Sequence, residues 1–247
     1  MKTICVIPAR LASSRFPRKV LSTLGEKPLL QWVWDAAQSC ELFDEVAFAI
    51  DDSATARLIE SFEGTYYMTS PDCLSGTDRL IELMQSKKLQ GDIWVNWQGD
   101  EPFIQREMID SLLQTIQEKK FDIWSLKKKI HTEEMIEDPS IVKVVTNAEN
   151  RALYFSRSPI PYFRDVIDFE EASYYKHVGI YAFTEKALKK IGSLSASPLE
   201  LAEQLEQLRF LENGLSMQVH ETTHETLGID LPEDLARALD WISSQIV

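Results

Sequence analysis

Short apolar runs alternate along the chain with amphipathic stretches, and the connections between them are short. The apolar runs predict strands near residues 4–7, 45–50, 65–68 and 92–97, and stretches with helical spacing follow them near 28–37, 53–62, 78–88 and 105–119. Runs of this length, bounded by turn residues, are typical of buried strands. Because strand and helix alternate with short connections, we predict an α/β fold with a doubly wound, mostly parallel sheet.

The pattern changes after residue 122. Strand candidates at 124–130, 141–146, 152–156 and 175–183 have little helix between them, and helices near 184–191 and 198–213, a strand at 216–220 and a helix at 232–245 follow. The sequence contains no internal repeat, low-complexity segment or Gly/Ser linker. We therefore predict a single domain over residues 1–247, with a β-rich subregion of mixed or antiparallel strands at about 122–183.

The stretch after the first predicted strand is basic. The run Ile4–Ile7 is expected to break at Pro8 and open into a loop that reaches Lys19, and the basic residues of this region all precede the first acidic one, Glu26. They are Lys2, Arg10, Arg15, Arg18 and Lys19. Since open α/β sheets bind ligands at the carboxyl ends of their strands, this loop is a candidate polyanion site. A solvated basic loop is the alternative.

Composition limits the class of protein. The formal net charge is -13, and the basic residues are locally concentrated, which argues against nucleic acid as a partner. No apolar run is long enough to span a bilayer, and the amino-terminal run is too short for the core of a signal peptide, so a cytoplasmic location is expected. Cys5, Cys40 and Cys73 are odd in number and widely spaced, so the sequence indicates neither a disulfide framework nor a zinc site.

Two aspartates are candidate metal ligands. Asp100 leaves a buried strand through Gly99, and a carboxylate placed there suits Mg²⁺, although it could instead cap the next turn. Asp230 precedes the last helix, and with Glu233 three residues later it also has the spacing of a capping box.

The remaining motifs are weaker evidence for a functional site when each is taken alone. Ser75-Gly76-Thr77 leads into a helix and suits an anionic ligand, or is an ordinary cap with Asp78. His177 lies in an alternating strand, where a core role competes with a catalytic one. Four glycines, at positions 76, 99, 179 and 228, are expected where the backbone needs φ > 0 or a close approach. The sequence has no Walker lysine and no GxGxxG motif, so the two commonest nucleotide-binding loops are absent. No Ser-His-Asp or Cys-His arrangement can be assembled either, which disfavours covalent catalysis and leaves phosphoryl or nucleotidyl transfer as the chemistry.

Seven segments in order resemble the cytidylyltransferases that activate 3-deoxy-manno-octulosonate (Kdo), the CMP-Kdo synthetases. The matching segments are IPARLASSRFPRK, SGTDR, QGDEP, ALYFSR, the H-x-G-I-Y segment at His177–Tyr181, SPLE with LEQLR, and GIDLPEDL. They run from Ile7 to Leu235 and cover nearly the whole chain.

The resemblance implies an α/β nucleotidyltransferase of lipopolysaccharide assembly that uses CTP and Mg²⁺, releases pyrophosphate and is a homodimer. It places Arg10, Arg15 and Lys19 on the triphosphate, with Arg10, Lys19 and Asp100 as the catalytic set. Pro8, Ala9, Ser75, Gly76 and Arg79 would frame the cytidine, and Asp100 and Asp230 would share the metal. The sugar acid would face Gln98, Arg157, His177, Tyr181, Glu203 and Gln204.

Two departures put the sugar in question. The family usually has glycine at the position of Arg18 and histidine at the position of Leu201. A close variant of the family activates 8-amino-3,8-dideoxy-manno-octulosonate, and both this sugar and Kdo stay open as substrates. CMP activation of another acid sugar, such as a sialic acid, and a non-catalytic CTP-binding regulator are the further alternatives.

Overall fold

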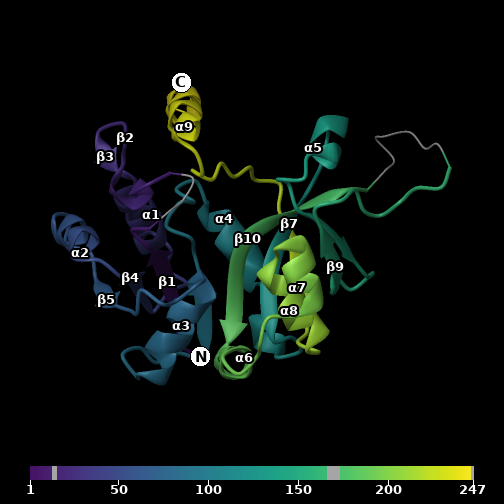
Figure 1. Ribbon diagram of the computed structural model, residues 1–247, viewed down its shortest axis with the longest axis horizontal. Coiled ribbons are helices and arrows are strands. Elements are labelled where there is room, and N and C mark those ends of the chain that lie inside the picture. The colour runs from purple at the N-terminus through teal and green to yellow at the C-terminus, as the bar shows by residue number, and fades with distance from the viewer. Residues whose placement is uncertain (13–15, 166–172, 246–247) are drawn as a thin grey trace. The chain divides into compact units, whose positions relative to one another are not determined.

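The computed structural model describes residues 1–12, 16–165 and 173–245 (Figure 1). Arg15, which the sequence analysis placed on the triphosphate, lies outside these residues. The chain groups into two compact units, one formed by residues 1–109 and 225–247 and the other by residues 110–224. Helix α4 (Arg106–Leu113) contains the division between them. The prediction of a single domain stays a prediction.

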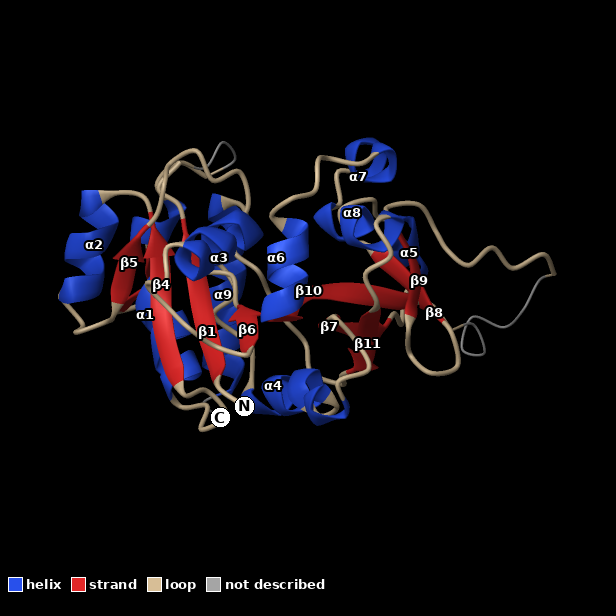
Figure 2. Ribbon diagram, turned by 90° about the horizontal axis from the view of Figure 1, so that it is seen from below, coloured by secondary structure: helices blue, strands red, loops and turns tan. Residues whose placement is uncertain are grey.

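The first unit is built on four parallel strands in the order β6, β1, β4, β5, which lie side by side in Figure 2. Their bounds are β1 Thr3–Ala9, β4 Glu45–Ile50, β5 Tyr66–Met68 and β6 Ile93–Asn96. Helices follow at α1 Leu29–Gln38, α2 Ser53–Glu60, α3 Gly76–Gln85 and, at the end of the chain, α9 Pro232–Gln245. The predicted α/β fold with a mostly parallel sheet is confirmed.

Helices cover both faces of this sheet because its strands are apolar on both sides. All seven residues of β1 are buried. On one face Phe48 of β4 stacks on Trp34 of α1, with ring centroids 5.3 Å apart. On the other face α3 packs against β1 and β6. Strands covered on both faces form near-continuous apolar runs, which is the pattern that the sequence shows here.

Pro8 lies inside β1, so the prediction that this strand breaks at Pro8 was wrong. The N–H and C=O of one strand residue point to the same side, and the Pro8 carbonyl accepts from the Gly99 N–H at 3.2 Å on the side of β6. The β6 ladder ends where Val6 pairs with Asn96. No ladder hydrogen bond is therefore lost at Pro8, and a strand tolerates proline under that condition.

Two glycines allow close packing at the end of β1. A Cβ at Gly76 would lie 3.0 Å from Pro8 Cγ, and one at Gly99 would lie 3.0 Å from the Pro8 carbonyl oxygen. The expectation of close approach is confirmed at these positions. It is wrong at Gly179 in β10, where a Cβ would have no described atom within 4 Å and φ is not positive.

The basic loop ends in a strained turn. Arg18 adopts φ 60° and ψ 26°, in the left-handed region, and the 3-10 helix η1 (Lys19–Leu21) follows directly. A two-stranded hairpin of β2 (Thr23–Leu24) and β3 (Lys27–Pro28), which the sequence analysis missed, then leads into α1. The left-handed conformation explains why a glycine suits the position of Arg18.

The second unit is an antiparallel and mixed set of strands (Figure 2). Strand β10 pairs antiparallel with β7 and β8, β9 pairs antiparallel with β8, and β11 runs parallel to β7. The bounds are β7 Ile123–Lys129, β8 Lys143–Thr146, β9 Ala152–Ser156, β10 Tyr175–Thr184 and β11 Met217–Glu221. The four strands predicted between 122 and 183 are confirmed.

The helix predicted at 198–213 is two helices, α7 (Pro198–Glu203) and α8 (Glu206–Glu212). Gln204 separates them with φ 55°. The guanidinium of Arg157, which directly follows β9, donates to the backbone carbonyls of Glu203 at 2.8 Å and Gln204 at 3.4 Å. These carbonyls lie at the end of α7, where the helix itself leaves them without partners. The unit also contains α5 (Glu133–Glu137), α6 (Glu185–Ile191) and the 3-10 helix η2 (Ile116–Glu118).

No helix in the described part of the chain has the length and apolar character that crossing a bilayer requires.

Substituting glycine for Arg18 is expected to stabilise the protein. A non-glycine residue in the left-handed region costs about 1–2 kcal/mol, while the extra freedom of glycine in the unfolded chain offsets about 0.5–1 kcal/mol of that relief. We therefore expect Arg18→Gly to raise the free energy of unfolding by up to about 1 kcal/mol, measured by urea denaturation. Arg57→Gly, inside α2, is the matched control and should lower it by about 1 kcal/mol. A loss of stability in Arg18→Gly would contradict the left-handed assignment.

Candidate functional site

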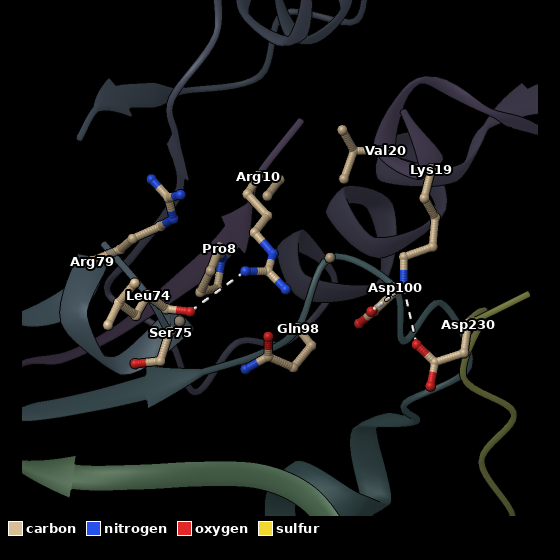
Figure 3. Close-up of a pocket in the computed structure, with 13 residues that line it drawn as sticks. Pro8, Arg10, Lys19, Val20, Leu74, Ser75, Arg79, Gln98, Asp100 and Asp230 are labelled. Atoms are coloured by element: carbon tan, nitrogen blue, oxygen red, sulfur yellow. Dashed lines mark hydrogen bonds and ion pairs between the residues drawn. The ribbon is translucent and has the colours of Figure 1, made fainter. Parts of the chain in front are cut away.

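A polar cavity of about 190 Å³ lies at the carboxyl end of β1 in the first unit (Figure 3). Its walls come from the end of β1 and the loop after it, from the start of α3, from the loop after β6 and from the segment before α9. The lining residues are Pro8, Ala9, Arg10, Lys19, Val20, Leu74, Ser75, Gly76, Arg79, Gln98, Gly99, Asp100 and Asp230. The predicted nucleotide and metal residues that the structure describes are therefore brought together.

The ammonium group of Lys19 lies between two carboxylates. Its Nζ is 2.6 Å from Asp100 Oδ2 and 3.2 Å from Asp230 Oδ1, and Figure 3 shows the three side chains converging. The Lys19 side chain is 9% exposed, whereas those of Asp100 and Asp230 are 32% and 50% exposed. A buried charge is costly without partners, so the two carboxylates are what allow this lysine to be buried.

Backbone contacts bring the two aspartates to one place although they are far apart in the sequence. The Ile229 N–H donates to the Asp100 carbonyl at 2.9 Å, which fixes the segment before α9 against the loop after β6. Gly228 permits this approach, because a Cβ there would lie 2.8 Å from Glu101 Oε1. The Asp234 carboxylate accepts from the N–H groups of Asp230 and Leu231, both at 2.9 Å, at the start of α9.

The carboxylate pair fits a small divalent cation. Two carboxylate oxygens already converge on one cationic atom, and such oxygens are the ligands that Mg²⁺ prefers when phosphates and waters complete its shell. Among the described residues no group of three or more His, Cys, Asp or Glu side chains is placed to hold a metal ion. A cation bound here would take its remaining ligands from water or from a substrate.

The opposite wall is the start of α3. Ser75 is its N-cap, with Ser75 Oγ accepting from the Asp78 N–H at 3.1 Å and Asp78 Oδ2 accepting from the Ser75 N–H at 3.0 Å. The capping alternative for Ser75 and Asp78 is confirmed. Because Ser75 and Gly76 also line the cavity, the positive end of the helix dipole faces it, which favours an anionic ligand.

Arg79 is buried behind this wall and is engaged by the protein. Its side chain is 2% exposed, and Nη2 lies 2.7 Å from Oδ2 of Asp51, whose side chain is 9% exposed. Arg79 Nη1 donates to Thr69 Oγ1 at 2.6 Å and to the Ser70 carbonyl at 3.2 Å. Both terminal nitrogens thus hold neighbouring segments in place.

Two further predicted residues reach the cavity from different sides (Figure 3). Arg10 is exposed, and its Nη1 lies at the limit of hydrogen-bonding distance, 3.5 Å, from the Leu74 carbonyl. Gln98 Nε2 donates to Oδ1 of the buried Asn96 at 2.8 Å. This hydrogen bond orients the amide of Gln98, so that its oxygen is the group left to accept from a ligand.

Three of the predicted sugar residues of the second unit, Arg157, Glu203 and Gln204, form one network at the end of α7. Glu203 accepts from Ser156 Oγ at 2.6 Å and from the Arg157 N–H at 2.9 Å. Arg157 in turn holds the backbone around Gln204. Leu201 is 59% exposed on the same helix. The structure brings Arg157, Glu203 and Gln204 together, chiefly through contacts to one another.

His177 and Tyr181 are neighbours on β10, with ring centroids 5.3 Å apart. Ser125 Oγ lies 2.9 Å from His177 Nε2, and the carbonyls of Ile180 and Val178 are also within its hydrogen-bonding distance, at 2.9 Å and 3.2 Å. Burial lowers the pKa of His177 to about 3 and, with Glu206, raises the pKa of Tyr181, so both are neutral near pH 7.

Sequence reasoning missed Asp51 and Asn96. Asp51 directly follows the buried strand β4, and Asp100 lies in the loop directly after β6, so a carboxylate close behind a buried strand was the available signal. Asn96 is a polar residue in an otherwise apolar strand and is 2% exposed. Burial of an amide normally requires a hydrogen-bond partner, which here is Gln98.

Comparison with known proteins gives the family. The family model described as "Cytidylyltransferase" matches residues 4–222. A 3-deoxy-manno-octulosonate cytidylyltransferase of Thermodesulfovibrio yellowstonii is 45% identical over 95% of this chain and 96% of its own length. The chain belongs to the 3-deoxy-manno-octulosonate cytidylyltransferase family.

Other family members and related structures agree. The enzyme of the same name from Geobacter sulfurreducens is 42% identical over 97% of this chain and 99% of its own length. The solved structure of a CMP:2-keto-3-deoxy-manno-octonic acid synthetase in complex with CTP has a TM-score of 0.92 at 40% identity, covering 99% of this chain and 100% of its own. A cytidylyltransferase from Leptospira borgpetersenii, 16% identical with a TM-score of 0.64, shares the fold of this cytidylyltransferase, covering 99% of this chain and 87% of its own.

Acid is expected to destabilise the protein through His177. Its pKa is about 3 when folded and 6.5 ordinarily, so the unfolded chain binds more protons between these values and the free energy of unfolding falls as the pH drops below 6.5. From pH 7.5 to pH 5 this group should remove about 2 kcal/mol, measured by urea denaturation. In His177→Gln the fall over the same range should be smaller by about that amount. An equal fall in both proteins would show that His177 takes up a proton freely in the folded state.

Proposed function

We propose that this chain transfers CMP from CTP to the anomeric hydroxyl of a 3-deoxy-manno-octulosonate-type sugar acid and releases pyrophosphate. Family membership supports the reaction class. The observation that carries the proposal is the cavity in which Lys19 lies between Asp100 and Asp230, with Arg10 and the start of α3 on the other sides. A polyphosphate, a metal ion and a nucleoside need that combination of cations, carboxylates and helix amide groups.

The proposed reaction needs no protein nucleophile. The anomeric oxygen forms a bond to the α-phosphorus of CTP, and the bond from that phosphorus to the oxygen bridging to the β-phosphate breaks. Pyrophosphate leaves with the electron pair of that bond, and the hydroxyl proton passes to water. Charge accumulates on the phosphate oxygens, so the work of the protein is to position the triphosphate and to stabilise that charge.

Arg10 and Lys19 are the cations proposed to act on the triphosphate. Arg10 is exposed at the cavity and can reorient toward phosphate oxygens, for which its planar fork is suited. The flexible stem of Lys19 allows its ammonium to exchange one set of oxygens for another. We propose that Lys19 occupies the cation position between Asp100 and Asp230 in the ligand-free enzyme and turns to a phosphate when the substrate is bound.

Asp100 and Asp230 are the residues proposed to hold Mg²⁺. Bound there, Mg²⁺ would neutralise charge on the triphosphate. The carboxylates would keep that charge close to the cavity, and the amide groups at the start of α3 would contribute from the opposite wall. We also propose, from family membership alone, that the enzyme is a homodimer, works in the cytoplasm and serves lipopolysaccharide biosynthesis.

Kdo is the first candidate for the acceptor, because the relatives described above are named for it. The 8-amino analogue is the second candidate. It is favoured by Leu201, an apolar and exposed residue where the family usually has histidine, since a polar group that could bind a sugar hydroxyl is absent at that position.

Pyrophosphate release with CTP and Mg²⁺ tests the function and the acceptor together. Kdo, its 8-amino analogue and a sialic acid should be compared at equal concentrations, and we expect release with a Kdo-type sugar to exceed release with the sialic acid by on the order of 10² or more. A preference for the 8-amino sugar would assign the chain to that branch of the family. Binding of CTP without release, whichever sugar is offered, would instead make it a non-catalytic regulator.

Removal of the Lys19 ammonium should separate its two proposed roles. Lys19→Ala is expected to lower kcat by on the order of 10²–10³, because a donor to developing charge is lost. Without CTP, the same variant should bind Mn²⁺, a spectroscopic substitute for Mg²⁺, more tightly than the parent, because no ammonium competes for the two carboxylates. Lys27→Ala, which removes an exposed lysine of the same unit paired with Asp35, is the control and should change neither quantity. Undiminished turnover in Lys19→Ala would remove this residue from the mechanism.

A further inference from the structure

Asp51 connects two segments that both contribute to the cavity wall. Its Oδ1 accepts from the N–H of Leu11, the residue directly after Arg10, at 3.0 Å. Its Oδ2 forms the 2.7 Å ion pair with Arg79 of α3. One carboxylate thus holds both the start of the basic loop and the helix that begins at the cavity.

Arg79 extends this connection to the loop before α3. Through Nη1 it binds Thr69 and Ser70, and Thr69 is itself fixed to the end of β4, since the Thr69 N–H donates to the Ile50 carbonyl at 2.7 Å. This loop leads to Leu74 and Ser75, which line the cavity. The carboxylate of Asp51 therefore sets the Leu74 wall through Arg79 and the Arg10 wall through Leu11.

We propose that Asp51 is a positioning residue for the nucleotide, acting through Leu11 and Arg79 without touching the ligand. The proposal rests on the proposed function, because it assumes that CTP occupies this cavity. Asp51 is absent from the cavity lining, and its two oxygens are already used by the protein. Its contribution is to fix the position of Arg10 relative to the start of α3, both of which line the cavity that the nucleotide would occupy.

An alternative role for the pair is stability alone. A buried ion pair is costly to break, because one charge is left without a partner, so loss of stability would not distinguish the two roles. A positioning role makes a narrower prediction. Perturbing Asp51 should weaken CTP binding far more than it changes the KM of the sugar acid.

Asp51→Asn is the first test variant. The amide can still accept from the Leu11 N–H, but its NH₂ group then faces Arg79, donor against donor, so one of the two connections is lost. We expect the Kd of CTP, measured by calorimetry without sugar, to rise on the order of tenfold, while the sugar KM stays within about twofold.

Asp44→Asn is the matched control. Asp44 stands at the other end of β4 and accepts a backbone N–H in the same way, from Thr3 at 2.7 Å, away from the cavity. The Asp44→Asn variant should bind CTP with a Kd within about twofold of that of the parent. A rise equal to that in Asp51→Asn would show a general effect of destabilising the sheet and would overturn the proposal.

Thr69→Val tests the second connection and keeps both charges, so it remains informative if Asp51→Asn does not fold. It removes the oxygen that accepts from Arg79 Nη1 while keeping the shape of the side chain. We expect it to raise the Kd of CTP about three- to tenfold, with the sugar KM unchanged.

A folded Asp51→Asn or Thr69→Val variant that binds CTP like the parent overturns the positioning role and leaves the proposed function intact. A parent protein that neither binds CTP nor releases pyrophosphate overturns the proposed function itself. The two failures are therefore distinguishable.

Discussion

The contact of one ammonium group with two carboxylates unites the candidate site. Lys19 follows the basic loop, Asp100 follows β6, and Asp230 precedes the last helix, so three distant parts of the sequence meet at one charge. Burial of Lys19 requires these partners, and the hydrogen bond from the Ile229 N–H to the Asp100 carbonyl holds the segments that carry them together. The same arrangement is the position that we propose for Mg²⁺ when the substrate is bound.

The fold explains why charge can be concentrated here. Strands β1, β4 and β6 are parallel and buried, so their carboxyl ends meet at one edge of the sheet. Each of these ends supplies polar groups: Arg10 comes just after β1, Asp51 after β4, and Gln98 with Asp100 after β6. The interior is mostly apolar, and polar groups at the edge are paired with one another or line the cavity.

Much of this could be predicted from the sequence, because buried strands leave a clear apolar pattern. The strand at Glu45–Ile50 was placed correctly to the residue. The helix at 198–213 was not, since Gln204 favours helices intrinsically and the break depends on Arg157, which lies far away in the sequence. The basic loop and Asp100, in contrast, could be found from the local sequence pattern. The pairing of Asp51 with Arg79, and of Lys19 with two aspartates, depends on tertiary contacts that periodicity does not reveal.

In the mechanism that we propose, Lys19 exchanges its carboxylate partners for the substrate. A crystal structure of the chain loaded with CTP and Mg²⁺ tests it most directly, through the position of Lys19 Nζ. We expect Nζ to leave its place 2.6 Å from Asp100 and 3.2 Å from Asp230 and to lie within hydrogen-bonding distance of a phosphate oxygen. A loaded structure in which Nζ stays between the two carboxylates, with the nucleotide bound, would contradict it.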